Sequence, residues 1–330
     1  MRWTEQQAND WYAKTGWLAG FNYVTSSAVN ATEMWQVETF DPASIRRELS
    51  LAAQYSYNTC RVFLPFLVWH TQRESFMRNL ELFLSIAAEN NISVMPILFD
   101  DCAFAGKEPY MGKQDAPIPG VSNSGWTPSP GPRIADDPQM EPALAAYVHD
   151  IIGTYANDAR VLVWDLYNEP GGSDRNDKSL PLLGKVFQWA RAAKPMQPLT
   201  ACVWVYQDYD FAAAELSDVV SYHDYGDIAQ SEERLRRLRQ YRRPLLCTEW
   251  LCRQFGNTFA SHLPFYQREN IGTYHWGLVL GKTQTNLHWS TMLGGTPEPN
   301  PAIWQHDIFH PDYTPYDAAE LVILRQARGL

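Results

Sequence analysis

The chain has 330 residues, of which 45% are hydrophobic and 13% aromatic, and its formal net charge is -10 with a sequence pI near 5.3. Such a chain can bury a large core, and its acidic balance argues against a nucleic-acid-binding surface, which concentrates Lys and Arg. There is no apolar run of about 18 residues and no signal-peptide pattern in residues 1–16, so we expect a cytoplasmic protein without a membrane partner.

Eight strand-like runs alternate with helix-like segments along the whole chain, and no linker divides them. Most of these runs are almost continuously apolar, as parallel strands covered on both faces are. We therefore expect one α/β domain over residues 1–330, folded as a (β/α)8 TIM barrel. A doubly wound sheet is disfavoured because no glycine-rich phosphate loop follows the first run. The expected strands are residues 17–24, 59–69, 93–100, 161–168, 199–206, 219–226, 244–250 and 272–280.

Several helix starts are predicted from capping residues. Asp41, Asp137 and Thr314 each precede a proline, so each predicts a helix whose first position is that proline. Thr71 and Glu74 have the spacing of a capping box, which predicts a helix start at Thr71.

Two connections are too long for simple strand-to-helix loops. Residues 101–136 follow the third expected strand and are rich in proline, and residues 281–315 follow the eighth strand. Long ordered loops at the carboxyl face of a barrel usually wall the site, because the strand-to-helix loops converge there. We expect these two segments to narrow a groove into a pocket.

Two glutamates stand at the ends of expected strands. Glu169 directly follows the expected strand 161–168 and precedes Pro170, while Glu249 lies at the carboxyl end of the expected strand 244–250. If the strands are counted correctly, the two carboxylates face each other across the barrel mouth. Glycoside hydrolysis needs such a pair, with one group protonated to release the leaving oxygen and the other ionised.

The surroundings of the two glutamates predict different roles. Arg61 and Tyr225, at the ends of two other expected strands, could both reach Glu249 and hold it ionised, as a nucleophile requires. Glu169 has the neutral amide of Asn168 and apolar neighbours, which favour the protonated form of a catalytic acid. Asn168 could also bind the sugar 2-hydroxyl.

Together these motifs resemble a known family. The motifs are Asn168-Glu169-Pro170, His223-Asp224-Tyr225, Thr248-Glu249-Trp250, Arg61 and Trp276. In this order they resemble the clan A retaining glycoside hydrolases, most of all glycoside hydrolase family 5, the cellulase family, and the resemblance covers nearly the whole barrel. It implies a (β/α)8 fold with Glu169 as acid/base and Glu249 as nucleophile. It also implies that the attacked sugar is held by Arg61, Asn168, His223, Tyr225 and Trp276.

One position departs from that family. Where such enzymes commonly have a histidine near the end of strand three, this chain has Asp100 and Asp101, so it resembles a divergent member. A carboxylate can accept two hydrogen bonds from a vicinal diol, and we expect both residues to bind substrate. Trp126 is expected to bind substrate as well, because apolar sugar faces stack on indole rings.

The sequence therefore predicts a retaining β-glycosidase that acts on β-linked oligosaccharides or small glycosides and needs no cofactor or metal. A divalent-metal sugar isomerase is an alternative, because Glu169, His223, Asp224, Asp227 and Glu249 could surround a cation, although Arg61 and Tyr225 would crowd it. A non-catalytic carbohydrate-binding barrel is a third possibility. The five cysteines show no zinc-type spacing and are expected to be buried free thiols.

Overall fold

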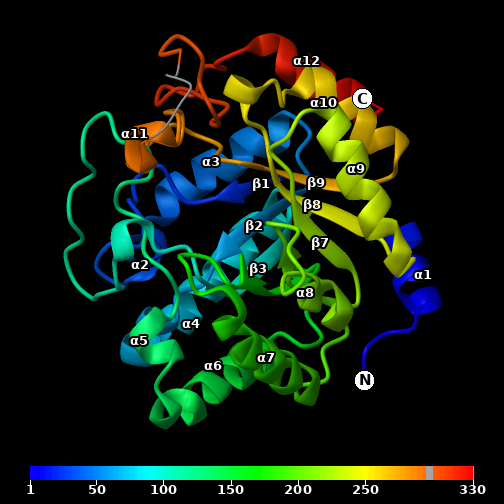
Figure 1. Ribbon diagram of the computed structural model, residues 1–330. Helices are drawn as coiled ribbons and strands as arrows, with labels where there is room; N and C mark the ends of the chain where they lie inside the picture. Colours follow the sequence, from blue (N-terminus) through cyan, green and yellow to red (C-terminus); the bar gives the residue numbers. More distant parts are fainter. Residues whose placement is uncertain (295–299, 330) are drawn as a thin grey trace.

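The strands form one closed parallel barrel. In the computed structural model, which describes residues 1–294 and 300–329, a sheet runs in the order β5-β4-β3-β2-β1-β9-β8-β7-β6 (Figure 1). Its strands are β1 (Ala19–Tyr23), β2 (Thr59–Phe63), β3 (Ser93–Asp100), β4 (Trp164–Asn168), β5 (Leu199–Thr200), β6 (Cys202–Val203), β7 (Val220–His223), β8 (Leu245–Trp250) and β9 (Gly272–Trp276).

Strands β5 and β6 are the two halves of one expected strand, interrupted only at Ala201. β5 pairs with β4, and β6 pairs with β7, so this broken strand closes the ring. All strand pairs are parallel, and nearly every strand residue is buried. The predicted (β/α)8 barrel is confirmed.

Helices surround the barrel, with their apolar stripes facing the strands (Figure 1). Over the described residues they are α1 (Glu5–Thr15), α2 (Ala31–Trp35), α3 (Pro42–Gln54), α4 (Phe66–Glu89), α5 (Pro132–Ala135), α6 (Glu141–Thr154), α7 (Leu180–Ala192), α8 (Phe211–Leu216), α9 (Ile228–Leu238), α10 (Phe259–Arg268), α11 (Ser290–Leu293) and α12 (Ala318–Ala327). No helix among these residues is long and apolar enough to cross a bilayer.

The predicted helix starts have mixed outcomes. Asp41 caps α3, where its carboxylate accepts a hydrogen bond from the Ser44 amide. Asp137 instead caps a short 3-10 helix, Pro138–Met140, directly before α6. The start at Thr314 is wrong, because its hydroxyl and amide both bond to Asp312 and the helix begins at Ala318.

The predicted capping box at Thr71 is also wrong. The Thr71 hydroxyl donates to the carbonyl of Leu67 within α4, which already begins at Phe66. The helix bends at Gln72, whose φ of -130° and ψ of 39° are not helical. The capping pattern therefore marks a kink rather than a start.

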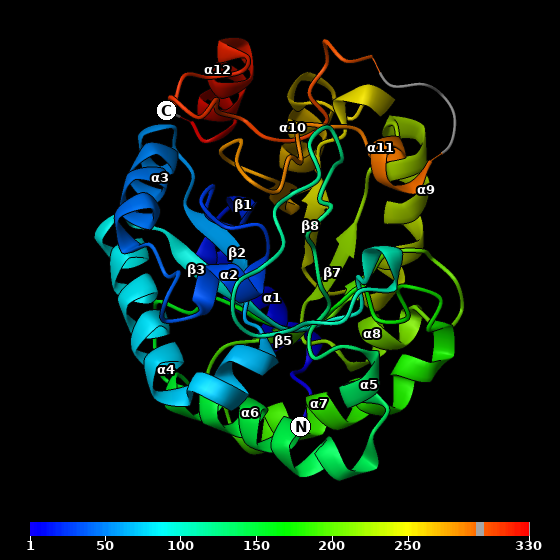
Figure 2. The same ribbon diagram turned by 90° about the vertical axis from the view of Figure 1, so that its left-hand side faces the viewer.

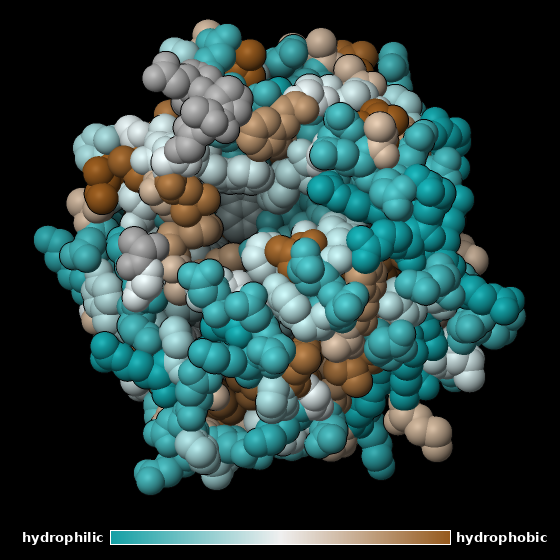
Figure 3. Space-filling view, viewed as in Figure 1, coloured by the Kyte–Doolittle hydropathy of each residue, from teal (hydrophilic) through white to brown (hydrophobic). Residues whose placement is uncertain are grey.

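The two long segments lie at the carboxyl ends of the strands. Figure 2 looks onto this end, and the segment that follows β3 crosses in front of the strands. The second segment contains α11, and its residues 295–299 lie outside the described residues. Figure 3 shows the surface hollowed near the carboxyl ends of the strands, with pale residues inside and hydrophobic residues on one rim.

The opposite end of the barrel is filled by side chains and covered by α1. Gly20 of β1 lies against Thr59 and Tyr274, and a Cβ at Gly20 would stand 2.6 Å from the Tyr274 ring and 2.7 Å from the Thr59 methyl group. These neighbours are buried and hydrogen-bonded to each other, so they have little room to move.

We predict that Gly20→Ala lowers the free energy of unfolding by about 1–3 kcal/mol, the usual cost of overpacking a core. Gly184→Ala in α7 is the matched control, because nothing lies within 4 Å of its Cβ position. Alanine favours a helix over glycine, so the control should stabilise the protein by up to ~1 kcal/mol. Urea unfolding measures the free energy of unfolding of both variants, and equal changes in Gly20→Ala and Gly184→Ala would contradict the prediction.

Candidate active site

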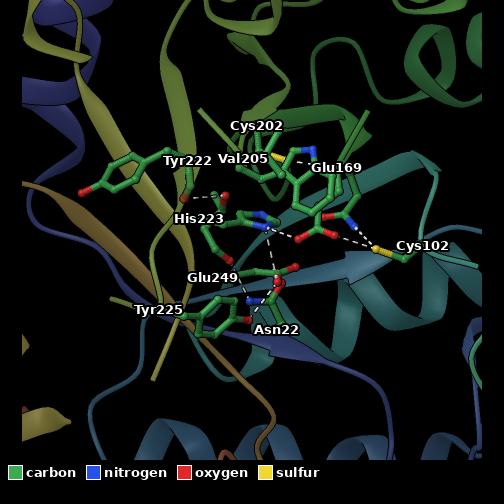
Figure 4. A network of polar contacts seen from close by, with 12 residues as sticks. Asn22, Cys102, Glu169, Cys202, Val205, Tyr222, His223, Tyr225 and Glu249 are labelled. Carbon is green, nitrogen blue, oxygen red and sulfur yellow. Dashed lines mark hydrogen bonds and ion pairs between the residues drawn. The ribbon is translucent and has the colours of Figure 1, made fainter. Parts of the chain in front are cut away.

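The strand register gathers polar side chains at the barrel mouth. Asn22 on β1 lies opposite Arg61 on β2, and His223 at the end of β7 lies opposite Glu249 on β8. Glu169 follows the last residue of β4. Figure 4 shows Glu169 and Glu249 pointing toward each other on either side of His223.

Glu249 is held by a cation and a hydroxyl. Arg61 donates from Nη1 to Glu249 Oε1 at 2.9 Å, and the Tyr225 hydroxyl donates to Oε2 at 2.9 Å. Only 6% of Glu249 is exposed. Burial raises the pKa of its carboxyl, and the charge of Glu169 raises it further, whereas His223, Arg61 and Tyr225 lower that pKa.

Glu169 has different partners and no cation in contact. The Cys102 thiol donates to Glu169 Oε2 at 2.7 Å, and His223 Nδ1 lies 2.8 Å from Oε1. Burial raises the pKa of the Glu169 carboxyl, and this rise is opposed by the thiol and more weakly by Arg61. The two carboxyls therefore differ in their contacts, since only Glu249 touches the guanidinium group.

The backbone of Glu169 is in the left-handed region, with a φ of 44°. Such a conformation is costly for a side chain of this size and is often found at functional sites. Two contacts hold it in place, because the Glu169 amide bonds to Cys202 Sγ at 3.1 Å and its carbonyl accepts from Gly172 at 2.9 Å. The turn thereby directs the carboxyl toward the barrel axis.

His223 lies between the two glutamates. Its Nδ1 atom is 2.8 Å from Glu169 and 3.4 Å from Glu249. Burial lowers the pKa of His223 to about 3, so the imidazole is neutral at ordinary pH. One oxygen of each glutamate and one nitrogen of His223 lie within 4.8 Å of one another.

Beneath these groups, Arg61 is fully buried and hydrogen-bonded on every side. Besides Glu249 it binds Asp165, Asn22 and Asn168 through their side-chain oxygens, at 2.6 to 2.8 Å. Arg61 has no exposed surface and does not line the pocket. It positions the pocket residues Glu249 and Asn168 through hydrogen bonds to their side chains.

The two aspartates at the end of β3, Asp100 and Asp101, do not line the pocket either. Asp100 accepts hydrogen bonds from Asn168 and from the Trp126 indole, and burial raises its pKa to about 7. Asp101 binds Tyr167, Arg175 and the turn after β4. Both carboxylates are occupied by protein groups, which differs from the expected contact with sugar.

The pocket above the glutamates has a volume of about 280 Å³ and a largely aromatic lining. Of the residues expected to bind substrate, Asn168, Tyr225, Trp126 and Trp276 line it, together with Glu169 and Glu249. His223 contacts both glutamates but is not part of the lining. Further aromatic side chains come from Phe63, Phe104, Trp204 and Trp289.

Sequence reasoning missed several residues that build this site. Asp165 and Asn22 were polar positions inside apolar strands, and a buried polar group in such a run is a signal that it needs a specific partner. Cys102 and Cys202 were expected to be inert thiols, and all five cysteines are indeed unpaired. Nothing in the sequence marked these two as neighbours of Glu169.

Known structures share this fold at low sequence identity. GH5_18 from Streptomyces cattleya, solved in complex with GlcNAc, is 14% identical with a TM-score of 0.60, over 95% of this chain and 81% of that one. An endo-beta-1,4-mannanase from Thermotoga petrophila is 11% identical with a TM-score of 0.60, over 97% and 78%. The beta-glucuronidase 2 of Bacteroides uniformis is 13% identical with a TM-score of 0.57, over 94% and 35%.

The chain has the barrel fold of glycoside hydrolases. The resemblance to a divergent member of family 5, predicted from the motifs, is therefore matched by the fold. No protein-family model matches the chain, and no curated protein matches it significantly.

We predict that Arg61→Met lowers the free energy of unfolding by about 3–5 kcal/mol at neutral pH, because it leaves Asp165 and Glu249 as unpaired buried carboxylates. The loss should shrink as pH falls, since protonation neutralises both carboxylates. Urea unfolding at several pH values measures this.

The matched control is Arg46→Met, which removes a pair with Glu89 whose two side chains are 49% and 56% exposed. Exposed ion pairs contribute about 0–1 kcal/mol to the free energy of unfolding, so Arg46→Met should change that free energy little. A loss for Arg61→Met that is equally small would show that the buried network does not depend on this cation.

Proposed function

We propose that the protein is a retaining β-glycosidase, with Glu169 as acid/base and Glu249 as nucleophile. The observation that carries the proposal is the unequal environment of two facing carboxyls. Only Glu249 contacts a cation, whereas Glu169 contacts a thiol and a neutral imidazole. When two buried carboxyls interact, they titrate as a pair, and this asymmetry favours the single proton on Glu169.

The spacing of the carboxyls supports double displacement. An oxygen of Glu169 lies within 4.8 Å of an oxygen of Glu249. Retaining enzymes hold their carboxyl groups about 5–5.5 Å apart, whereas inverting enzymes need about 6.5–9.5 Å to admit a water. The short spacing leaves Glu249 in reach of the anomeric carbon itself.

In the first step, Glu249 attacks the anomeric carbon and the glycosidic C–O bond breaks, while the Glu169 proton passes to the leaving oxygen. In the second step, water attacks the same carbon and gives its proton to Glu169, and the ester bond to Glu249 breaks. Trp276 is only partly buried and offers an aromatic surface for the sugar, whereas Trp126 is 2% exposed and packs behind it, and Asn168 binds the 2-hydroxyl.

We propose β-linked oligosaccharides or small glycosides as the substrate class. The structural neighbours act on or bind different sugars, among them GlcNAc, Manb1-4GlcNAc and mannan. They support a carbohydrate substrate, and the test therefore uses a panel of 4-nitrophenyl and 2,4-dinitrophenyl β-glycosides of several sugars.

On the best substrate of that panel, Glu249→Ala and Glu169→Ala should each lower kcat by roughly 10³-fold or more. Azide should restore turnover in both variants, giving an α-glycosyl azide with Glu249→Ala and a β-glycosyl azide with Glu169→Ala. The reason is that azide replaces the nucleophile in the first case and the water in the second. NMR of the products measures this.

The control is Glu38→Ala, an exposed carboxylate outside the pocket, which should leave kcat unchanged. NMR should also show that the first anomer released by the unmodified protein is β. Release of the α anomer would exclude Glu249 as a nucleophile.

A metal-dependent isomerase is the second candidate, because Glu169, His223 and Glu249 each offer one ligand atom within a 4.8 Å cluster. The Arg61 guanidinium, 2.9 Å from Glu249, disfavours a further positive charge there. Activity that is abolished by EDTA and restored by a divalent cation would favour the isomerase over the glycosidase.

Cys102 offers a test of the acid role. Burial, together with the charges of Glu169 and Asp100, raises the pKa of its thiol far above the usual value, so it remains a hydrogen-bond donor. That hydrogen bond stabilises ionised Glu169, and Cys102→Ala should therefore raise the pKa of Glu169. Since the acid must be protonated, the alkaline limb of kcat/KM against pH should move to higher pH.

Cys60→Ala is the matched control, because Cys60 is a buried thiol in the core away from the pocket. It should leave the pH profile in place even if it lowers stability. A downward shift of the alkaline limb in Cys102→Ala would contradict the donor role of the thiol.

A further inference from the structure

Glu169 defines the side of the pocket from which the leaving group departs. In the proposed mechanism its proton passes to the leaving oxygen, so the group on that oxygen lies beside this carboxyl. The Cys102 thiol touches the carboxyl directly, 2.7 Å from Oε2 (Figure 4). The Trp204 indole donates to the carbonyl of Pro170, the next residue in the chain, at 3.2 Å. Cys102 and Trp204 are both partly exposed and line the pocket.

Phe104 belongs to the same surface. It lies two residues after Cys102, begins the short 3-10 helix Phe104–Gly106, and is partly exposed to the pocket that it lines. We call Cys102, Phe104 and Trp204 the leaving-group surface. None of these side chains carries a hydroxyl, an amide or a charge, and the N–H of Trp204 is already bonded to Pro170.

The loop after β6, which supplies the indole, is fixed by Asp210. One oxygen of this buried carboxylate accepts hydrogen bonds from three successive amides, those of residues 204–206, at 2.8 to 3.0 Å. Tyr209 of the same loop lies against Gly171, where a Cβ would stand 2.7 Å from the tyrosine ring. The loop therefore packs on the turn after β4, and its indole needs little ordering when a ligand binds.

The rest of the lining adds few polar groups. Apart from the two glutamates, no charged side chain among the described residues lines the pocket, and His306 is neutral because burial lowers its pKa to about 3. The Thr285 hydroxyl donates to Asp307, and the side-chain oxygen of Asn168 accepts from Arg61. A second sugar on the leaving-group surface would lose hydrogen bonds to water and gain none from its side chains.

Two aliphatic side chains extend the apolar lining. Met292 and Leu293 of α11 line the pocket, and Leu293 is 66% exposed. Figure 3 shows hydrophobic residues on one rim of the hollow. Aromatic rings can stack on a sugar, whereas an aliphatic side chain is stabilised mainly when apolar groups cover it. The lining thus favours a ligand with an apolar part.

We propose that the group released beside Glu169 is apolar, so that the substrates are small β-glycosides of aryl or alkyl alcohols rather than oligosaccharides. The pocket volume of about 280 Å³ is near the lower limit for small-molecule sites, as expected for one sugar and a compact aglycone. When the glycosidic C–O bond breaks, the alcohol carries away the Glu169 proton and water takes its place. This inference rests on the proposed glycosidase function and names the leaving group.

The first experiment uses the methyl, butyl and hexyl β-glycosides of the best sugar in the panel. The three alcohols are nearly equal as leaving groups, so the series isolates the contact with the alkyl chain. We expect kcat/KM to rise roughly two- to fourfold for each methylene that is buried. The disaccharide in which the same sugar is β-linked to glucose should be cleaved more slowly than the hexyl glycoside, although a sugar is the better leaving group.

Equal kcat/KM along the alkyl series, or faster cleavage of the disaccharide, overturns the inference and leaves the glycosidase function standing. Absence of cleavage of every glycoside in the panel overturns the proposed function and the inference with it.

The second experiment compares Phe104→Ala and Phe104→Leu with the unmodified protein on the same series. Phe104→Ala should lower the ratio of kcat/KM for the hexyl glycoside to that for the methyl glycoside by roughly threefold or more, because apolar area that the chain covers is lost. Phe104→Leu should keep most of this ratio. A loss in Phe104→Ala that is equal for the methyl and hexyl glycosides would mean that Phe104 only shapes the loop, and it overturns the inference.

Met196→Ala is the control for the loss of an apolar side chain. Met196 is 58% exposed and lies outside the pocket, so the ratio for the hexyl and methyl glycosides should stay as in the unmodified protein. A further readout needs no turnover. Calorimetric titration with alkyl 1-thio-β-glycosides, which resist hydrolysis, should show an affinity that rises from methyl to hexyl and rises less in Phe104→Ala. An affinity that does not depend on chain length also overturns the inference.

Discussion

Arg61 is a cation without access to solvent, and the centre of the barrel is arranged around it. Its charge is balanced by the carboxylates of Asp165 and Glu249, and the side-chain oxygens of Asn22 and Asn168 accept hydrogen bonds from its other N–H groups. A buried charge of this kind is stable only when every partner is in place. Four side chains from three strands, β1, β4 and β8, are thus placed relative to one guanidinium group, and the geometry of the mouth follows.

The same arrangement gives two similar carboxyls different surroundings. Both Glu169 and Glu249 are buried, so burial alone raises the pKa of each. The direct contact with Arg61 distinguishes Glu249, whereas Glu169 contacts Cys102 and His223. Neutral His223 then spans the gap without adding a charge that would equalise them.

The sequence predicted the barrel and both glutamates because each depends on local pattern. Apolar runs mark buried parallel strands, and a carboxylate at a strand end marks the mouth. The partners of those glutamates depend on register and loop path, which local pattern does not encode. Asp101 illustrates this limit: its position next to β3 suggested sugar binding, yet Tyr167 of β4 donates to one of its oxygens and the Gly171 amide in the turn after β4 donates to the other. Thr314 similarly had the right neighbours for a cap but was held by Asp312 instead.

The long segments show how specificity can be added to a common barrel without changing its centre. The strands fix the glutamates and Arg61, whereas Ser122 and Asn123 belong to a segment tied down by hydrogen bonds to another segment. That tie fixes the backbone of the turn by contacts that do not involve the strands. Changes in this turn would alter the wall of the pocket, while Glu169 and Glu249 stayed where the strand ends place them.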